Sequence, residues 1–432
     1  MNFRTTATLA AACLFAPAGV ARAQAPASVS TQATAPAGNE ERNSLHAPAT
    51  AGDAQAQFAL GNYYFQTRYV GLDYAQALAW YRKSAAQGFA PAQDQLGSMY
   101  KNHIGLPQDD KRAVNNYRLA ANQGYAPAEC HLAAMYEAGR GVHKDYKQAL
   151  GWYRKAAEQN LADAEEEVGY FYQSGLGGKR DYAQALSWYR RASSHGSSNA
   201  ENQLGYMAEE GLGQPQNYAG ALSWYEKAAE QGNGQAQENI GYMIQHGSGV
   251  PKDFAKAMSW FGKAAAQGNS DAMNQLGWMF QYGQGVEADS AMALRWYQLS
   301  AGQGNIHGKR NVEDFTSELE EQGDGAWQNA TAPVHDPVFD QAQRWANIQD
   351  LHGRIDAVES DALYQEDLAS QLERMGKGKN DGISKVFHAM GSLGATKYHI
   401  QAERDRDEAA RLRDELARIE SQRQTVADDR TP

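Results

Sequence analysis

A cysteine beside a histidine is the first pair in this sequence whose side chains could do chemistry. Cys130 is followed directly by His131, and an imidazole can activate a neighbouring thiol as a nucleophile. Adjacent residues of a helix point about 100° apart, however, and no Asp or Asn that would orient the histidine can be identified. We therefore interpret Cys130 as a small, semi-buried helix residue.

Metal binding and acid–base hydrolysis are two further chemistries that the residue types allow. The eleven histidines are scattered without a His-x-x-x-His pair, and there are only two cysteines, so the usual zinc ligand sets are not present. Two facing acids could hydrolyse a glycan or murein, but nothing singles out such a pair. The run Glu165-Glu166-Glu167 is expected to be solvated helix surface. We expect no enzyme activity, no metal and no cofactor.

Pairs of glycines separated by one residue recur in the chain, for example at Gly139-Arg140-Gly141 and Gly283-Gln284-Gly285. A glycine-rich loop that binds phosphate follows a strand and opens a helix. No strand precedes these pairs, and they return at a constant interval. They are therefore predicted to be turns between helices, and their interval points to an internal repeat.

A unit of 36 residues repeats seven times without insertion. Positions five and 26 of the unit are always Ala, and position 30 is always aromatic, with Trp before it in six units. Such a period indicates a stacked array of supersecondary units. The predicted array spans residues 52–320: units 52–87, 88–123, 124–159, 160–195, 196–231, 232–267 and 268–303, and a partial eighth unit at 304–320.

The apolar positions of each unit form two helical stripes. Positions five, nine and twelve form one stripe, and positions 26, 29, 30, 33 and 34 form the second. The Asp or Asn at position 22, such as Asp253, is expected to cap the second helix. The Gly or Asn that opens each unit is expected to end the preceding helix in a left-handed conformation. The predicted fold class is all-α, a solenoid of helix–turn–helix units.

The unit closely resembles the Sel-one-like repeat family, which is related to the tetratricopeptide repeat. The resemblance implies a right-handed α/α superhelix whose first helices line a concave surface, and roles in assembling protein complexes. Some exported members carry paired cysteines in each repeat and are named as β-lactamases; this chain lacks the pairs, so that activity does not transfer. The likeness is carried in the sixth unit by Ala236, Ile240-Gly241, Gly247-Ser248-Gly249-Val250, Asp253, Ala257, Trp260-Phe261 and Lys263-Ala264-Ala265.

Positions eight and eleven of the first helix are predicted to form the binding surface on the concave face. Position eleven points about 100° away from the apolar stripe, and Tyr and Trp are favoured at binding hot spots. The competing interpretation is that these rings pack between adjacent first helices. The candidate binding residues are Tyr170, Tyr206, Tyr242 and Trp278 at position eleven, and Glu167, Gln203, Asn239 and Gln275 at position eight.

Such a surface predicts a protein or peptide partner, bound by an interaction scaffold. Aromatic rings flanked by amides and acids also suit a glycan, so a glycan- or peptidoglycan-binding envelope protein is the alternative. The formal net charge of −11 argues against nucleic acid and anionic membrane surfaces as partners.

Residues 1–23 are predicted to be a cleaved signal peptide. Arg4 is followed by an apolar stretch, and Ala21-Arg22-Ala23 offers small residues at both positions that a signal peptidase recognises. A lipoprotein signal that uses Cys13 is the alternative. The protein is therefore expected to be periplasmic or secreted, without membrane insertion of the mature chain.

Four segments flank the repeats. Residues 24–51 and 321–338 are predicted to be linkers, the first of them disordered, because their compositions cannot bury a core. Residues 339–425 have apolar residues at helical spacing on either side of a break, and they are predicted to form a helical hairpin or a coiled coil that offers a surface for self-association. A long, mostly solvated helix is the alternative. Residues 426–432 are predicted to be a disordered tail.

The N-terminus of the processed protein tests the export prediction. We expect N-terminal sequencing of protein from the extracytoplasmic fraction to begin at Gln24, because cleavage follows the Ala-x-Ala site. Cytoplasmic protein that retains Met1 would contradict this expectation.

Overall fold

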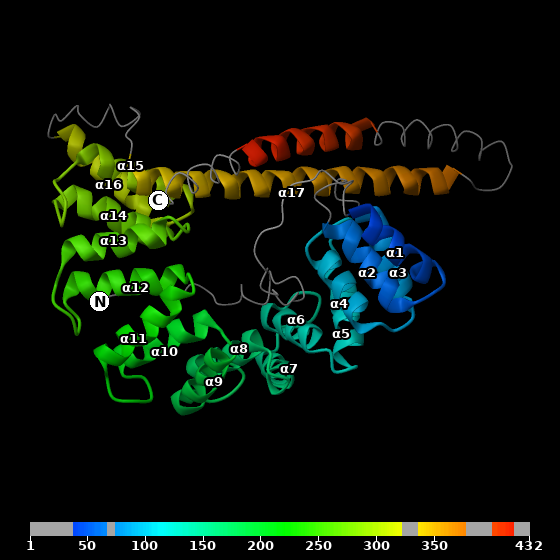
Figure 1. Cartoon of the computed structure of the whole chain (residues 1–432), viewed down its shortest axis with the longest axis horizontal. Coiled ribbons are helices and arrows are strands. Elements are labelled where there is room, and N and C mark those ends of the chain that lie inside the picture. Colours follow the sequence, from blue (N-terminus) through cyan, green and yellow to red (C-terminus); the bar gives the residue numbers. More distant parts are fainter. Residues whose placement is uncertain (1–37, 67–73, 322–335, 377–399, 419–432) are drawn as a thin grey trace. The chain divides into compact units, whose positions relative to one another are not determined.

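The computed structural model describes residues 38–66, 74–321, 336–376 and 400–418, and all its regular elements within these ranges are helices (Figure 1). None of these helices combines the length and the apolar composition that crossing a membrane requires. The numbered helices are α1 (Gly38–Thr50), α2 (Ala54–Gln66), α3 (Tyr74–Ala86), α4 (Ala90–Lys101), α5 (Asp110–Ala121), α6 (Ala126–Ala138), α7 (Tyr146–Glu158), α8 (Ala162–Ser174), α9 (Tyr182–Ser194), α10 (Ser198–Glu210), α11 (Tyr218–Glu230), α12 (Gly234–His246), α13 (Phe254–Ala265), α14 (Ser270–Tyr282), α15 (Ser290–Gly302), α16 (Ile306–Glu321) and α17 (Pro337–Gly376).

The chain divides into two compact units, Met1–Trp188 with Val358–Asp407 and Tyr189–Ala357 with Glu408–Pro432. In the first unit, each helix from α1 to α8 packs against its neighbours in the sequence, and α10 to α16 do the same in the second. The even-numbered helices α2 to α14 are the first helices of the seven repeats, and the odd-numbered helices that follow them are the second helices. This confirms the predicted all-α solenoid of helix pairs.

The ends of the helices follow the capping signals of the sequence. Asp253 Oδ1 accepts a hydrogen bond from the backbone N–H of Lys256 at 3.0 Å, and Asn217 Oδ1 accepts one from Gly220 at 2.9 Å. These contacts satisfy donors that a helix N-terminus otherwise leaves unpaired. At the other end of a repeat, Gly88 has φ +85° and Asn160 has φ +64°, which is the predicted left-handed stop.

In most helix pairs, a buried aromatic ring of the second helix packs against a glycine of the first helix. The aromatic residue at position 30 is almost fully buried in every repeat, and the alanines at positions five and 26 are buried beside it. A Cβ atom added to Gly205 at position ten would lie only 2.6 Å from ring carbons of Tyr225, and Gly97 meets Tyr117 at the same distance. The two helices can therefore approach each other closely because position ten has no side chain.

The hydroxyl of the buried tyrosine finds an acceptor on the first helix of its own repeat. Tyr225 donates to Glu209 Oε2 at 2.8 Å, and Tyr297 donates to Gln281 Oε1 at 2.7 Å. Both acceptors are at position 14. Repeat six has Phe261 in place of tyrosine, and the position-14 residue Gln245 has a buried Oε1 atom without a hydrogen-bond partner in the described part of the chain. The missing hydroxyl accounts for the unpaired oxygen.

Residues 38–50 correct the predicted disordered linker at 24–51. They form α1, which packs on α2, and Ala49 is buried in a cluster with Leu60 and Trp80. The apolar face of the first repeat has no preceding repeat to cover it, so α1 takes that place. Residues 24–37, the predicted signal peptide at 1–23 and the predicted tail at 426–432 lie outside the described residues.

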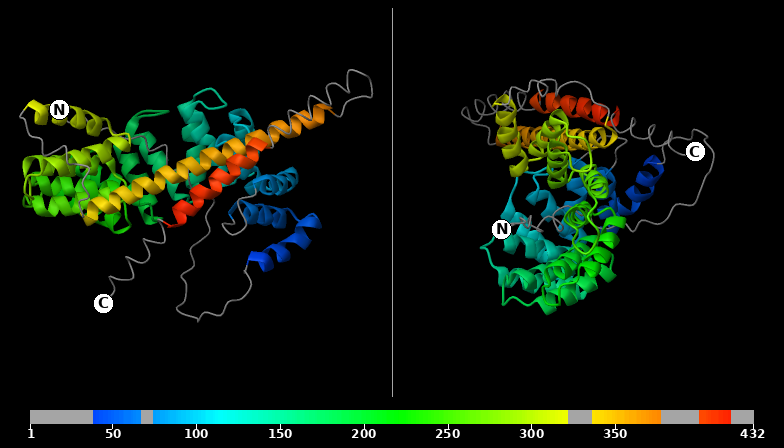
Figure 2. Two further views of the ribbon diagram at one scale, coloured as in Figure 1. Left: turned by 90° about the horizontal axis from the view of Figure 1, so that it is seen from above. Right: turned by 90° about the vertical axis from the view of Figure 1, so that its left-hand side faces the viewer.

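Beyond the repeats, α17 is one continuous helix that ends at Gly376, where the sequence predicted a break. A second helix, residues 400–418, runs beside α17 in the views of Figures 1 and 2. In the second unit, Leu351 and Ile355 of α17 and Ala409 and Leu412 of the other helix are buried. Most of the predicted linker at 321–338 lies outside the described residues. The coiled coil and self-association remain predictions.

Two glycine-to-alanine changes test the contact between ring and glycine. Gly205→Ala should destabilise the fold by up to about 2 kcal/mol, because displacing the Tyr225 ring costs about 1–3 kcal/mol and helix propensity returns about 1 kcal/mol. Gly151→Ala on α7 is the matched control: nothing lies within 4 Å of the added methyl group, so it should stabilise the fold slightly. Urea unfolding measures both, and equal effects of the two changes would contradict the steric account.

Phe261→Tyr should restore the hydroxyl that repeat six lacks. A hydrogen bond to Gln245 Oε1 should raise the free energy of unfolding by about 0.5–1.5 kcal/mol. The gain should vanish when the same change is made together with Gln245→Leu, a comparison that urea unfolding of the four proteins provides. A gain that persists without Gln245 would show that the hydroxyl acts elsewhere.

Candidate interaction surface on the first helices

The first-helix face is the surface formed by positions eight and eleven of the first helices. In the second unit it is carried by α10, α12 and α14, and in the first unit its predicted residues lie on α8. The rings of Tyr170, Tyr206, Tyr242 and Trp278 are all half-buried, and each packs against a neighbouring core cluster. Part of every ring is thus committed to packing, and part remains accessible.

Tyr242 is the most firmly held of these rings. Its hydroxyl accepts a hydrogen bond from Gln275 Nε2 at 2.6 Å, which joins position eleven of one repeat to position eight of the next. The ring also meets Phe261 edge to face, with 5.3 Å between the ring centroids, and it stacks on His246. For this residue the structure therefore supports packing between adjacent first helices, the competing interpretation.

Trp278, in contrast to Tyr242, pairs with a second aromatic residue that is exposed to solvent. Its ring centroid is 5.1 Å from that of Tyr282, and Tyr282 is 56% exposed. Sequence reasoning missed Tyr282, which follows Trp278 by one helical turn, so the signal was an aromatic pair at i and i+4 on one helix. Large exposed rings of this kind are the typical anchors of a binding surface.

Polar residues link successive first helices in a ladder from position seven of one repeat to position eight of the next. Asn239 Nδ2 donates to Asn202 Oδ1 at 2.9 Å, and in the first unit His131 Nδ1 lies 2.7 Å from Asp94 Oδ1. Asn239 is only 7% exposed, so it holds two helices together and does not present its amide to a partner. The same ladder pairs His131 with Asp94, which argues against a dyad with the buried Cys130.

The carboxylates Glu165, Glu166 and Glu167 are buried, contrary to the expectation of a solvated helix surface. They occupy the part of α8 that faces its neighbours in the stack, where helical position outweighs the preference of a charge for water. Glu167 is 1% exposed, and neither of its carboxyl oxygens has a hydrogen-bond partner among the described residues. As a predicted binding residue, Glu167 is therefore corrected: its side chain is inside the fold.

Burial raises the pKa of Glu167 well above its usual range, and the nearby carboxylates of Glu137, Glu166 and Asp163 raise it further. Glu137 accepts a hydrogen bond from Tyr153 Oη at 2.9 Å, and burial also raises the pKa of this carboxyl. Glu166 and Glu167 are buried, and Glu137 and Asp163 are half-buried beside them. Among the described residues, no group of three or more His, Cys, Asp or Glu is arranged to hold a metal ion.

Because the pKa of Glu167 is raised in the folded protein, the stability of the protein should fall as the pH rises. When the pKa of a carboxyl is raised in the folded state, that state keeps its proton above about pH 4.5 while the unfolded state loses it, so a rise toward neutral pH favours unfolding.

We expect Glu167→Gln to unfold at higher urea concentration than the parent at pH 7.5 and to differ less from the parent at pH 4.5. Glu158→Gln, on the exposed side of α7, is the control and should show no such pH dependence. Parallel pH profiles for parent and Glu167→Gln would contradict the assignment.

Comparison with known proteins identifies the repeat. The Sel1 repeat family model matches seven consecutive segments, at 54–89, 90–125, 126–161, 162–197, 198–233, 234–269 and 270–305. No curated protein matches the chain.

Two solved structures share the fold. One is c5321, described as a protective antigen present in uropathogenic Escherichia coli strains displaying an SLR fold. The two sequences are 28% identical, the match covers 87% of this chain and 94% of that chain, and the TM-score is 0.55. The other is a Sel1 repeat protein from Oxalobacter formigenes, 33% identical over 56% of this chain and 96% of its own, with a TM-score of 0.53. Because the family model matches more than half of the chain in seven unbroken repeats, this protein is a member of the Sel1 repeat family.

Proposed function

We propose that this protein is an exported scaffold that binds a peptide or protein partner on its first-helix face. Sel1 repeat solenoids generally serve as protein-interaction scaffolds, and membership in that family supports the general role. The chain itself supplies the finer part of the proposal, which concerns the surface used and the compartment.

The aromatic pair of Trp278 and Tyr282 carries the proposal for the surface. Tyr282 exposes more than half of its area although the ring gains nothing from water, and Trp278 fixes its position from one turn away. Half-buried Tyr206 and Gln203 extend the same kind of surface on α10, within the same unit. Rings with a rigid base and an accessible edge bind a partner at small cost in side-chain entropy.

The expected signal peptide supports the extracytoplasmic location. The similar protein from uropathogenic Escherichia coli is described as a protective antigen, and a location outside the cytoplasm is consistent with that description. For the present chain, the apolar N-terminal stretch and the Ala-x-Ala site carry this part of the proposal.

Affinity capture with the processed full chain as bait tests the surface. A Trp278→Ala, Tyr282→Ala double variant should lose the captured partner, because alanine changes at such anchors cost about 2 kcal/mol or more of binding free energy. Its melting temperature should fall, because Trp278 packs against the core, whereas Tyr282→Ala alone should weaken capture with little change in melting temperature, since Tyr282 is largely exposed. Tyr242→Phe is the matched control: it removes the hydrogen bond from Gln275 and should cost about 0.5–1.5 kcal/mol of stability while capture persists.

The same variants distinguish the alternatives. A double variant that still captures the partner at parental level would refute the aromatic anchor. Binding of the parent to purified peptidoglycan sacculi, lost in the double variant, would instead favour the glycan-binding alternative. Tyr206→Ala provides a second position on the face, and it should weaken capture in the same direction if the surface extends to α10.

A further inference from the structure

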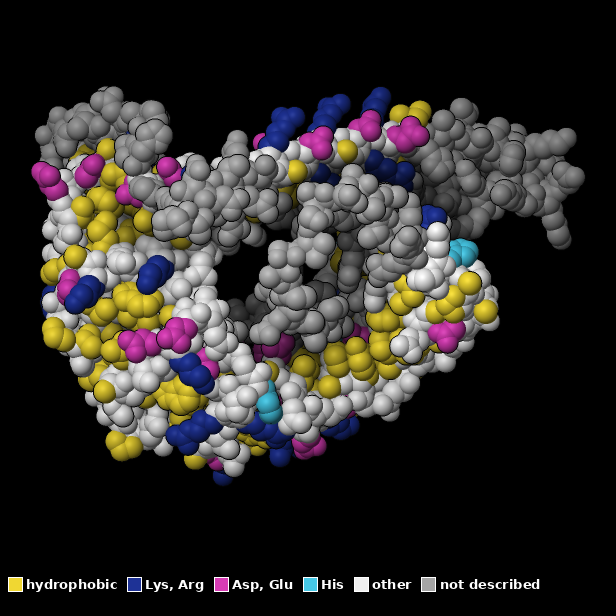
Figure 3. All heavy atoms as spheres, in the orientation of Figure 1, with side chains coloured by type: hydrophobic (Ala, Val, Ile, Leu, Met, Phe, Trp, Pro, Cys, Tyr) yellow, Lys and Arg dark blue, Asp and Glu magenta, His cyan; other side chains and the backbone are white. Residues whose placement is uncertain are grey.

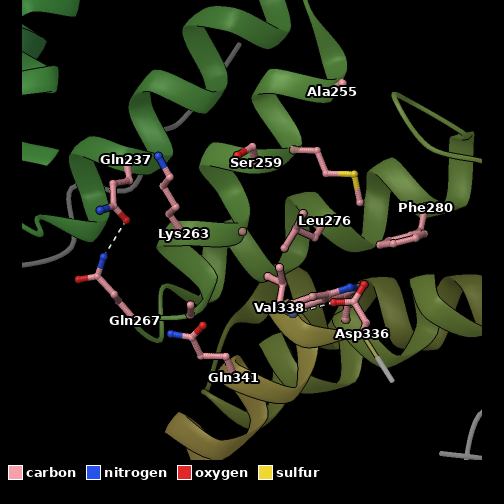
Figure 4. A pocket seen from close by; sticks show the side chains of 14 residues that line it. Gln237, Ala255, Ser259, Lys263, Gln267, Leu276, Phe280, Asp336, Val338 and Gln341 are labelled. Carbon is pink, nitrogen blue, oxygen red and sulfur yellow. Dashed lines mark hydrogen bonds between the residues drawn. The ribbon is translucent and has the colours of Figure 1, made fainter. Parts of the chain in front are cut away.

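A pocket of about 610 Å³ lies in the second unit, and none of the residues proposed to bind a partner lines it. Residues of α12, α13, α14, α15 and the start of α17 line it (Figure 4). The volume falls within the range of small-molecule sites, about 300–1,000 Å³.

The sequence of repeat six is adapted to the helix that closes this pocket. Position 31 carries a long polar or charged side chain in the other repeats: Arg82, Arg118, Arg154, Arg190, Glu226 and Gln298. Repeat six has Gly262 there, and a Cβ atom at this position would lie 3.1 Å from Val338 Cγ1 of α17. The glycine thus makes room for the first turn of α17.

Repeat seven is adapted in the same way. Trp296 is 1% exposed, whereas Trp224 and Trp260 at the equivalent position are half-buried, because Phe339 of α17 packs edge to face against Trp296 with 5.0 Å between the ring centroids. Ala342, one turn further along α17, is fully buried in the same core cluster. The contact between α17 and the last two repeats is therefore a specific interface, and the pocket is part of this interface.

One end of the pocket is apolar. Figure 4 shows Leu276, Phe280 and Val338 at this end, and Met258 also lines the pocket. Trp296 also lines the pocket, and in the described part of the chain its buried indole N–H has no hydrogen-bond acceptor.

The other end is polar and carries a positive charge. Figure 4 shows Lys263, Gln237 and Gln267 on this side, where Gln267 Nε2 donates to Gln237 Oε1 at 2.7 Å. The ammonium of Lys263 is held 3.9 Å from the centroid of the Trp260 ring, and no carboxylate of the described residues pairs with it. The acid at the pocket, Asp336, is engaged as the cap of α17, where its Oδ1 accepts from the backbone N–H groups of Val338 and Phe339.

From this arrangement we propose that the pocket binds a small amphiphilic carboxylate, with its apolar group among Met258, Leu276 and Phe280 and its carboxylate toward Lys263. The pocket is lined by α13, α14, α15 and the start of α17, so a ligand bound in it fastens α17 to the last two repeats. Two sources supply this chemistry: a free fatty acid, and a peptide C-terminus whose last side chain is apolar.

Calorimetric titration of the processed full chain tests the proposal with one probe for each source. The probes are decanoate and N-acetyl-Ala-Ala-Leu, each compared with its neutral amide. We expect saturable one-site binding of at least one carboxylate, at an affinity about five-fold or more above that of its amide, because the partly exposed ammonium contributes modestly. The probe that binds identifies the source. Absence of saturable binding by both carboxylates would overturn the proposal.

Variants locate the binding within the pocket. Lys263→Gln should abolish the preference for carboxylate over amide, whereas Lys155→Gln should leave it unchanged, since Lys155 sits over Trp152 at 3.8 Å in a repeat of the first unit. Met258→Trp should fill the apolar end and abolish binding of both forms. Trp296→Phe, which replaces a lining indole with a smaller ring, should weaken binding of both forms if Met258→Trp fails to fold. Binding that survives both changes at Met258 and Trp296 would place the ligand elsewhere and overturn the proposal.

Discussion

The contact between an aromatic ring and a bare glycine is the constraint on which the rest of the structure depends. In repeat five, the Tyr225 ring lies where any side chain at Gly205 would be, and the same contact recurs between Gly277 and Tyr297. Close approach of the two backbones fixes the distance between paired helices. That distance in turn determines which first-helix positions face a neighbour and which face solvent.

The buried tyrosine also ties the core to the polar layer of the first helices. Because its hydroxyl is buried with the ring, it needs an acceptor, and Glu137, Glu209 and Gln281 supply one from position 14 of the first helix. Polar residues at positions seven and eight then connect one repeat to the next. The polar residues of the first helices are therefore of two kinds, those that join helices and those that remain available to a partner.

Regular spacing explains why most of the fold was predictable and part of the site was not. Alanines, capping residues and left-handed glycines recur in register, so the helix pairs follow from the sequence alone. Burial of Glu167 and Asn239 did not follow, because it depends on the neighbouring repeat in space, where a polar ladder replaces apolar packing. Likewise α1 has the composition of a linker and is helical because the exposed end of the first repeat offers Leu60 and Trp80 as a surface.

Gly262 has a consequence for how the length of this protein can change. The residues that receive α17 belong to the last two repeats, whereas the residues that stack one repeat on the next are common to the array. Duplication or loss of an internal repeat would therefore alter the number of helix pairs without moving the C-terminal helix from the end of the array. Gene segments encoding internal repeats are thus free to vary in number during evolution, while the segment from Gly262 onward is inherited as one piece.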